Sequence, residues 1–155
     1  MDLEVERCNF KSKAHRDAVV MLIDAYMQDP MGVGKPFDQA LIEPLLEGMS
    51  THPSAFMLLA RQDQQFVGLA TCVIGFSTFQ ASPLINIHDI IVFPDFRGKG
   101  VGRILLKAVE EVAREMDCIK ITLEVRSDNI IAQELYLSEG YGEATPPLLF
   151  WSKQL

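Results

Sequence analysis

The feature that most constrains the fold is a glycine-rich turn between an apolar run and a long amphipathic segment. Residues 90–92 are apolar, Pro94 breaks the run, and Gly98, Gly100 and Gly102 follow. Glycine lacks Cβ, so this backbone can approach a ligand closely, and the N–H groups that open a helix carry partial positive charge. The stretch therefore predicts a strand, a phosphate-binding loop and a helix.

Two better-known phosphate loops fit this spacing poorly. A dinucleotide fingerprint needs G-x-G-x-x-G, but here the third glycine falls one residue early and Arg103 stands in its place. That fingerprint also belongs to the first strand of its domain, whereas about two thirds of this chain precedes the loop. Glu124 lies near the distance expected of a ribose-binding carboxylate, so the dinucleotide interpretation is weakened but stays open. A P-loop needs Ser or Thr after its lysine, and Gly100 follows Lys99.

The rest of the chain alternates strand and helix patterns within one expected domain, residues 1–155. A length of 155 residues with 48% hydrophobic composition suits a single core. Apolar alternation or apolar runs predict strands at residues 3–6, 56–61, 66–76, 84–92, 119–125 and 148–151. Helical spacing predicts helices at residues 14–25, 38–49, 101–116 and 128–140, the last capped by Ser127-Asp128 and ended by Gly140. Residues 29–36 are rich in breakers, which predicts a flexible loop over a pocket.

Charge and cysteine content exclude several classes of protein. A net charge of −7 argues against binding to nucleic acid or to an anionic membrane, since both require a surplus of Lys and Arg. The charged amino terminus is unlike a signal peptide, and no apolar run approaches the ~20 residues of a membrane span, so we expect a cytoplasmic protein. Cys8, Cys72 and Cys118 are widely spaced, which predicts reduced structural thiols and no metal site.

Two motifs in order make the chain resemble the GNAT superfamily of acyl-CoA-dependent N-acyltransferases. Residues 97–102 match the pattern [RQ]-x-x-G-x-[GA], with Arg97, Gly100 and Gly102 in the diagnostic places. The helix that begins at Asn129 matches the second cofactor motif of the family, and the resemblance covers residues 54–145 well. It implies an α/β (α+β) single domain with a mixed, mostly antiparallel central sheet of about 6–7 strands flanked by about 4 helices.

The resemblance also implies acetyl-CoA as the cosubstrate, with no metal. In the family the loop amides and the helix N-terminus hold the pyrophosphate, and the central strand binds the acyl-pantetheine arm where it splays from the next strand. Carried over residue by residue, the cofactor-binding set is Ile90, Ile91, Val92, Arg97, Gly98, Lys99, Gly100, Val101, Gly102, Arg103, Asn129, Ala132 and Tyr136.

The chemistry implied is attack of an amine on a thioester, which needs a base and a proton for the leaving thiolate. His88 and Asp89 are the candidate bases because an alkyl amine with a pKa of ~10.4 is mostly protonated at neutral pH. Consecutive strand residues point to opposite faces, so one of the two is expected to face the substrate. His88 is favoured by a resemblance to a polyamine-acetylating branch of the family, and a buried structural histidine is the alternative. Tyr136 shares a helical face with Asn129, so it is the candidate general acid, with a core aromatic as its alternative.

The function implied is therefore N-acetyl transfer to a primary amine by direct attack, with Tyr136 as acid and His88 or Asp89 as base. The acceptor is a small molecule or a peptide or protein amine, and the resemblance allows a homodimer. An acyl-CoA-binding regulatory domain without turnover is the alternative function. The acceptor pocket is expected around residues 29–37 and 76–84, which carry no motif.

Overall fold

The computed structural model describes residues 2–155, which divide into two compact units. The first unit runs to Glu124 and the second from Val125 to Leu155. The expected single domain of residues 1–155 stays a prediction.

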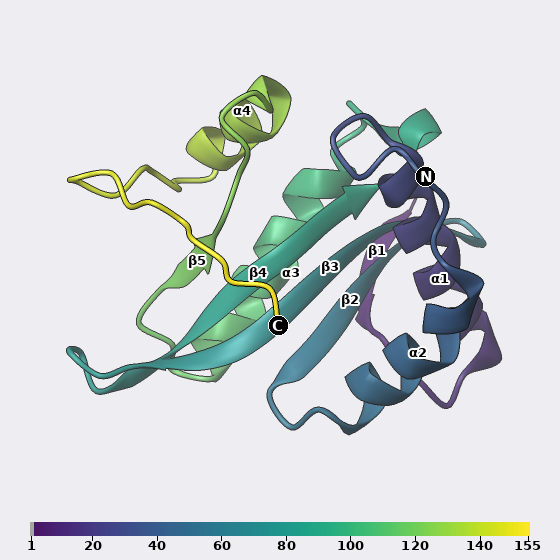
Figure 1. The fold of residues 1–155 in the computed structure, drawn as a ribbon, viewed down its shortest axis with the longest axis horizontal. Coiled ribbons are helices and arrows are strands. Elements are labelled where there is room, and N and C mark those ends of the chain that lie inside the picture. Colours follow the sequence, from purple (N-terminus) through teal and green to yellow (C-terminus); the bar gives the residue numbers. More distant parts are fainter. Residues whose placement is uncertain (1) are drawn as a thin grey trace. The chain divides into compact units, whose positions relative to one another are not determined.

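The first unit alternates strands and helices much as the patterns predict (Figure 1). Its elements are β1 (Leu3–Arg7), α1 (Lys13–Gln28), the 3₁₀ turn η1 (Gln39–Leu41), α2 (Ile42–Thr51), β2 (Ala55–Gln62), β3 (Gln65–Ser77), β4 (Ser82–Val92), the 3₁₀ turn η2 (Pro94–Phe96), α3 (Val101–Glu115) and β5 (Ile121–Leu123). The second helix begins at Ile42, later than expected, because Asp38 caps η1 through Ala40 N–H instead. Pro44 then lies in the first turn of α2, where its missing N–H has no helical partner to lose.

The central sheet has the order β1-β2-β3-β4-β5 within the described residues. All neighbouring strands are antiparallel except β4 and β5, which are parallel, so the mostly antiparallel α/β class is confirmed. The expected count of 6–7 strands is wrong, because the sheet has five in the part of the chain described here. Residues 148–151, the predicted last strand, have no regular structure. An apolar run becomes a strand only where its backbone has a ladder partner, and no strand pairs with this run among residues 2–155.

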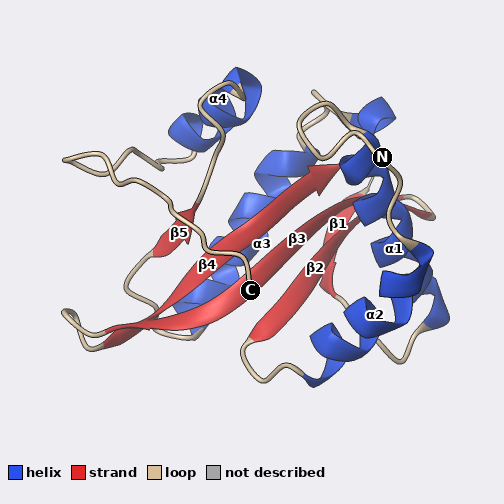
Figure 2. Cartoon of the chain, viewed as in Figure 1, coloured by secondary structure: helices blue, strands red, loops and turns tan. Residues whose placement is uncertain are grey.

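The sheet of the first unit is covered on both faces (Figure 2). On one face Val19 and Leu22 of α1 pack with Leu59, Leu69 and other apolar residues of β2, β3 and β4 in one buried cluster. On the other face lies α3, whose Val101 and Leu105 side chains meet β3. Gly68 of β3 allows this approach, since a Cβ there would lie 2.7 Å from Val101 Cγ1 and 3.0 Å from Leu105 Cδ1. The N-terminus of α3 is therefore held against the middle of the sheet.

The second unit contains one helix, α4 (Ile130–Ser138), within its described length. Asn129 caps it, because its Oδ1 accepts from Ala132 N–H at 3.2 Å; the predicted cap at Ser127-Asp128 is wrong by one residue. Gly140 has φ +89°, the left-handed conformation expected after a helix end. Across both units, no helix in residues 2–155 combines the length and apolarity needed to cross a bilayer.

Candidate active site

A β-bulge interrupts β4 at the two candidate bases. Asp89 pairs with Thr71 of β3, and Ile87 pairs with the next residue, Cys72, so His88 is left without a partner in the register. Strict alternation of faces fails at such a bulge, and the expectation that His88 and Asp89 point to opposite faces loses its basis. His88 is exposed, which contradicts the alternative of a buried structural histidine.

Asp89 lies on the face of the sheet that α1 covers. It is two residues from Ile91, which belongs to the buried cluster with α1, and regular strand geometry from Asp89 onwards places both side chains on one face. Burial raises the pKa of Asp89, and the nearby Thr71 hydroxyl and His88 ring offset part of that rise. Thr71 Oγ1 is buried and makes no hydrogen bond of standard geometry within residues 2–155. A half-buried carboxyl with a raised pKa is a stronger base than an ordinary aspartate.

The two central strands part beside these residues. β4 pairs with β5 only from Ile85 to Ile87, opposite Ile121 to Leu123. From Asp89 to Val92, β4 keeps its pairing with β3 but has no strand on its other side in the described chain. Phe93 N–H donates to Val67 C=O of β3, so by alternation the N–H groups of Ile90 and Val92 point away from β3. The splay that the resemblance implied is therefore present, and it bares a short strand edge.

In the glycine loop, residues 97–103, two glycines adopt a left-handed backbone conformation. Gly98 and Gly100 adopt φ +72° and +87°, and a Cβ at either would meet nothing within 4 Å. Gly98, Lys99 and Gly100 are exposed, and in the described chain their N–H groups make no hydrogen bond of standard geometry. The loop therefore presents open amides at the positive end of α3, which suits a phosphate group.

Residues 101–103 differ in what they can offer a ligand. Val101 and Gly102 are buried under the loop, where they anchor the first turn of α3 to the sheet. Arg103 is exposed, and Lys99 holds its ammonium 5.1 Å from the centroid of the Phe96 ring. The backbone that a cofactor can reach in this loop is therefore limited mainly to residues 98–100, which are fewer residues than the motif contains.

Arg97 makes contacts that the motif does not indicate. Its Nε donates to Val92 C=O at 3.1 Å, and its Nη2 lies 2.8 Å from Asp29 Oδ2. Asp29 is the residue that ends α1, and its Oδ1 accepts from Met31 N–H at 2.9 Å. The Met31 N–H bond and the Arg97 guanidinium lower the pKa of Asp29. No local pattern could have paired these two side chains, because they are joined only by the folded sheet.

The loop after α1, residues 29–37, is folded back on its own helix. Val33, Gly34 and Lys35 N–H groups all point to Met27 C=O, at 3.0, 2.7 and 3.3 Å. Asp24 Oδ1 accepts from Phe37 N–H at 2.8 Å, which ties down the far end. Gly32 is required here, because a Cβ would lie 2.1 Å from Tyr26 O. This α1 loop is therefore a hydrogen-bonded unit, and its flexibility and its place over a pocket stay predictions.

The remaining candidate residues belong to the second unit. The side-chain oxygen of Asn129 caps α4 by accepting a hydrogen bond from Ala132 N–H. The Tyr136 ring is tilted against Tyr141, with centroids 6.1 Å apart. The roles of these three residues stay predictions.

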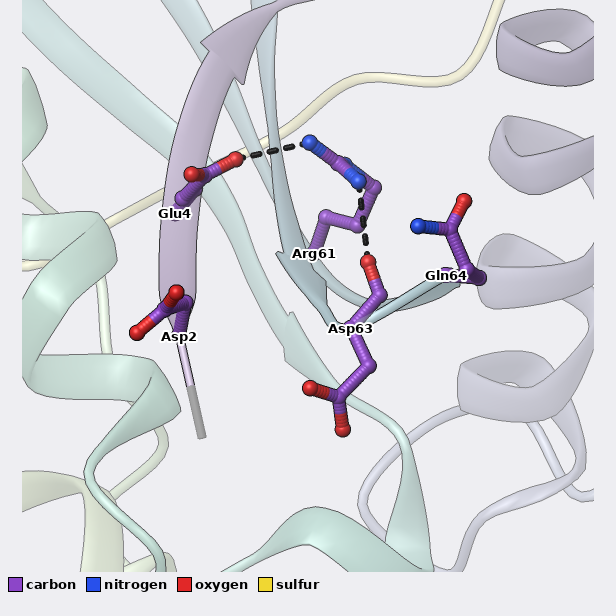
Figure 3. Close-up of a pocket in the computed structure, with 5 residues that line it drawn as sticks. All are labelled: Asp2, Glu4, Arg61, Asp63 and Gln64. Atoms are coloured by element: carbon purple, nitrogen blue, oxygen red, sulfur yellow. Dashed lines mark hydrogen bonds and ion pairs between the residues drawn. The ribbon is translucent and has the colours of Figure 1, made fainter.

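One pocket lies at the β1 edge of the first unit's sheet, separated from β4 by β2 and β3 (Figure 3). Its volume is about 290 Å³, and Asp2, Glu4, Arg61, Asp63 and Gln64 line it. Arg61 already binds Glu4 Oε2 at 2.7 Å and Asp63 C=O at 2.8 Å, as the dashed lines show. The arginine of this pocket is therefore already paired with Glu4, at the edge of the sheet away from β4.

Comparison with known proteins identifies the family. Residues 19–141 match the model of the Acetyltransferase (GNAT) family, a span that includes β4, the glycine loop and α4. The chain belongs to the GNAT family of acetyltransferases. The match crosses from the first unit into the second.

Relatives of this GNAT protein are N-acetyltransferases. It is 28% identical over 103 residues to the uncharacterized N-acetyltransferase YhfO of Bacillus subtilis (strain 168), which covers 66% of this chain and 69% of YhfO. It is 28% identical over 104 residues to the aminoglycoside N(6')-acetyltransferase type 1 of Acinetobacter haemolyticus, covering 65% of this chain and 71% of that protein.

A solved structure supports the fold across the whole chain. The structure of AAC(6')-Iy in complex with a bisubstrate analog, CoA-S-monomethyl-acetylneamine, superposes with a TM-score of 0.80 at 20% identity, and the alignment covers all of both chains. The chain is therefore a GNAT N-acetyltransferase in fold and enzyme class.

Proposed function

We propose that this GNAT protein transfers an acetyl group from acetyl-CoA to a primary amine of a small molecule. The amine attacks the thioester directly, in the gap of the first unit where β4 parts from β5. The proposal rests on one continuous run of backbone. It begins at Asp89, follows the edge of β4 that has no strand partner, and ends at the open amides of residues 98–100. One end of that run has a base, and the other end has an anion site.

The residues of the run fit a coenzyme A molecule. The pyrophosphate would be held by the exposed amides of Gly98, Lys99 and Gly100, together with the dipole of α3. Neither glycine has a Cβ to obstruct the approach of the ligand. The N–H and C=O of Ile90 and the N–H of Val92 face away from β3 and would bind the pantetheine amides as a strand partner would, while Val92 C=O already accepts from Arg97 Nε. Ile91 instead pairs its backbone with β3 and buries its side chain, so its role is to hold the edge in place.

Acetyl-CoA supplies an acetyl thioester that an amine attacks, with a thiolate as the leaving group. The amine must lose a proton, and we assign its removal to Asp89, because partial burial raises its pKa and brings it closer to neutral pH. His88 is exposed in the bulge beside it, where it can pass the proton to solvent.

The thiolate needs a proton in return, and we assign this step to Tyr136. A phenol of pKa ~10 can protonate a thiolate of pKa ~8.5 only when the thiolate is held close, so the role depends on position. Tyr136 O–H then becomes a phenolate that regains its proton from water, which leaves the enzyme unchanged after each turnover. Carried over from the family motif, Tyr136 is the group in α4 with this chemistry.

The acceptor class follows from the relatives and from charge. The Acinetobacter haemolyticus relative acts, by its name, on aminoglycosides, which carry several amino groups, and the solved structure holds a bisubstrate analog that joins CoA to acetylneamine. A net charge of −7 favours approach of such cationic molecules over anionic ones. A small primary amine is therefore the first acceptor to test, with aminoglycosides at the head of the panel.

The test is release of CoA thiol from acetyl-CoA across a panel of aminoglycosides, polyamines, amino acids and peptides. We expect turnover on at least one polyamine, with kcat/KM lowered on the order of 10² to 10⁴-fold in Asp89→Asn and 10 to 10²-fold in Tyr136→Phe. His88→Gln should lose less than Asp89→Asn. Wild-type thermal stabilisation by acetyl-CoA without turnover on any amine would instead support a binding or regulatory domain.

A further inference from the structure

An ion pair joins the two loops that flank the proposed reaction centre. Asp29 ends α1 and begins the α1 loop, while Arg97 begins the glycine loop, and the pair is closed at 2.8 Å. The Asp29 side chain is only 13% exposed and that of Arg97 is 47% exposed, so the contact is partly shielded from water. Shielding of this kind makes a pair stronger than a fully exposed surface ion pair.

Each partner of the pair is fixed by a second bond on its own side. The other oxygen of Asp29, Oδ1, accepts from Met31 N–H, so this hydrogen bond holds the carboxylate in place within the α1 loop. Arg97 uses Nε to donate to Val92 C=O at the end of β4, so the guanidinium belongs rigidly to the bare strand edge. A planar guanidinium can serve both partners at once, which a lysine ammonium on a flexible stem does less well.

Hydrogen bonds tie the α1 loop behind Asp29 together. Three of its amides donate to Met27 C=O, and Phe37 N–H donates to Asp24, so the loop is linked along its length and a shift of Asp29 would be passed along it. On the other side of the pair, Arg97 is followed directly in the chain by the exposed amides of residues 98–100, so the position of Arg97 sets where that stretch begins.

We propose that Asp29 is a positioning residue that couples the α1 loop to the glycine loop through Arg97, so that binding of CoA stabilises the loop expected to form the acceptor pocket. The inference rests on the proposed function, since it assumes that CoA occupies the glycine loop. Coupling of this kind is reciprocal, so an amine that orders the α1 loop also raises the affinity for CoA. Asp29 remains ionised at neutral pH, because Met31 N–H and Arg97 both lower its pKa.

The first test is amide hydrogen exchange of the α1 loop with CoA as the added ligand. In the wild-type protein, CoA should slow exchange at Val33, Gly34 and Lys35 by about threefold to tenfold. In Asp29→Asn, which keeps an oxygen for Met31 N–H but loses the charge, CoA should change these rates by less than about twofold. The matched control is Asp38→Asn, a neighbouring acid that caps η1 and has no contact with Arg97 among the described residues; it should behave as wild type.

The second test is a double-mutant cycle on CoA affinity, measured by calorimetry without turnover. Asp29→Asn and Arg97→Gln should each weaken CoA binding by about threefold to tenfold, and the double variant should be no weaker than the worse single variant within about twofold. Glutamine is the other residue that the family pattern allows at position 97, so binding should survive. If Asp29→Asn does not fold, Arg97→Lys tests the same link from the other side and should lose most of the CoA effect on the α1 loop.

Three outcomes decide the matter. Additive losses in the cycle, or equal slowing of loop exchange in wild type and Asp29→Asn, overturn the coupling while leaving the proposed function intact. Absence of CoA binding to the wild-type protein overturns the proposed function itself and the coupling with it. Non-additive losses together with a lost loop response establish Asp29 as the positioning residue.

Discussion

The α1 loop and the glycine loop are both rich in glycine, yet they use their backbone in opposite ways. In the α1 loop the amides of residues 33–35 donate to Met27 C=O, and the Cβ position of Gly32 is filled by Tyr26 O at 2.1 Å. In the glycine loop the amides of residues 98–100 have no partner of standard geometry in the described chain, and the Cβ positions of Gly98 and Gly100 are open. One loop is closed on the protein, and the other is open to a ligand.

The contrast shows that glycine content alone does not identify a binding loop. Gly34 and Gly100 share the left-handed conformation, with φ +74° and +87°, so backbone geometry is similar in the two places. What differs is the destination of the N–H groups, and that depends on the helix each loop adjoins. The α1 loop follows a helix C-terminus, which supplies carbonyls, whereas the glycine loop precedes a helix N-terminus, which supplies donors.

The largest expected effect is a loss of stability when a side chain is added at Gly32 of the α1 loop. Gly32→Ala would place Cβ against Tyr26 O and 3.1 Å from Met27 Cα, and backbone on both sides leaves no inexpensive relaxation. We expect a loss of about 2–4 kcal/mol in the free energy of unfolding, measured by urea denaturation. Gly48→Ala in α2 is the control, because nothing lies within 4 Å of that Cβ and alanine favours a helix, so stability should hold or rise. Equal stability of the two variants would contradict the closed-loop description.

The next effect separates strain from ligand binding. Gly100→Ala and Gly34→Ala each force alanine into a left-handed conformation, at a cost of about 1–2 kcal/mol of stability. We expect CoA affinity to fall about tenfold in Gly100→Ala and by less than about twofold in Gly34→Ala, since strain at residue 100 also displaces the open amides. Calorimetric titration of CoA checks this. Equal losses of affinity would remove the distinction between the loops.

A smaller effect on stability follows from two aspartates whose pKa values are shifted in opposite directions. The pKa of Asp29 is lowered, so its ionised form stabilises the fold above its ordinary pKa of 3.8, and that stability is lost as pH falls through the lower folded value. Asp29→Asn should therefore be less stable than wild type at pH 7, by less than about 1 kcal/mol, and equal to it in strong acid. Urea denaturation at both pH values provides the comparison, and a difference that persists in acid would contradict the ion pair as its source.

Asp89 should behave in the opposite sense. Its pKa is raised by burial, so the ionised form is disfavoured in the folded protein, and stability declines as pH rises from the ordinary value of 3.8 through the folded one. Asp89→Asn should accordingly gain stability relative to wild type at pH 7 while losing activity. A loss of both would show that the Asp89 charge is structurally satisfied.

Sequence reasoning predicted the parts of the molecule that depend on local pattern. The spacing of Val101, Leu105 and Val109 defined α3, and the strand before it ended at Val92 as expected. The order of strand, glycine-rich turn and helix followed from the same stretch, and the left-handed conformations of Gly98 and Gly100 are a finding of the structure.

What sequence could not predict depends on residues distant in the chain. The bulge at His88 exists only relative to the register of β3, and the Asp29–Arg97 pair exists only once α1 and β4 lie together. The run at residues 148–151 has the composition of a strand, but strand formation requires a partner that composition does not provide.

The most direct test of the central claim is residue-resolved amide exchange by NMR, with and without CoA. The account predicts slow exchange at Val33, Gly34 and Lys35 in the free protein, fast exchange at Gly98, Lys99 and Gly100, and strong protection of the second group when CoA is added. Amides at residues 98–100 that are already protected in the free protein, or that CoA leaves unchanged, would contradict the assignment of this loop as the cofactor site.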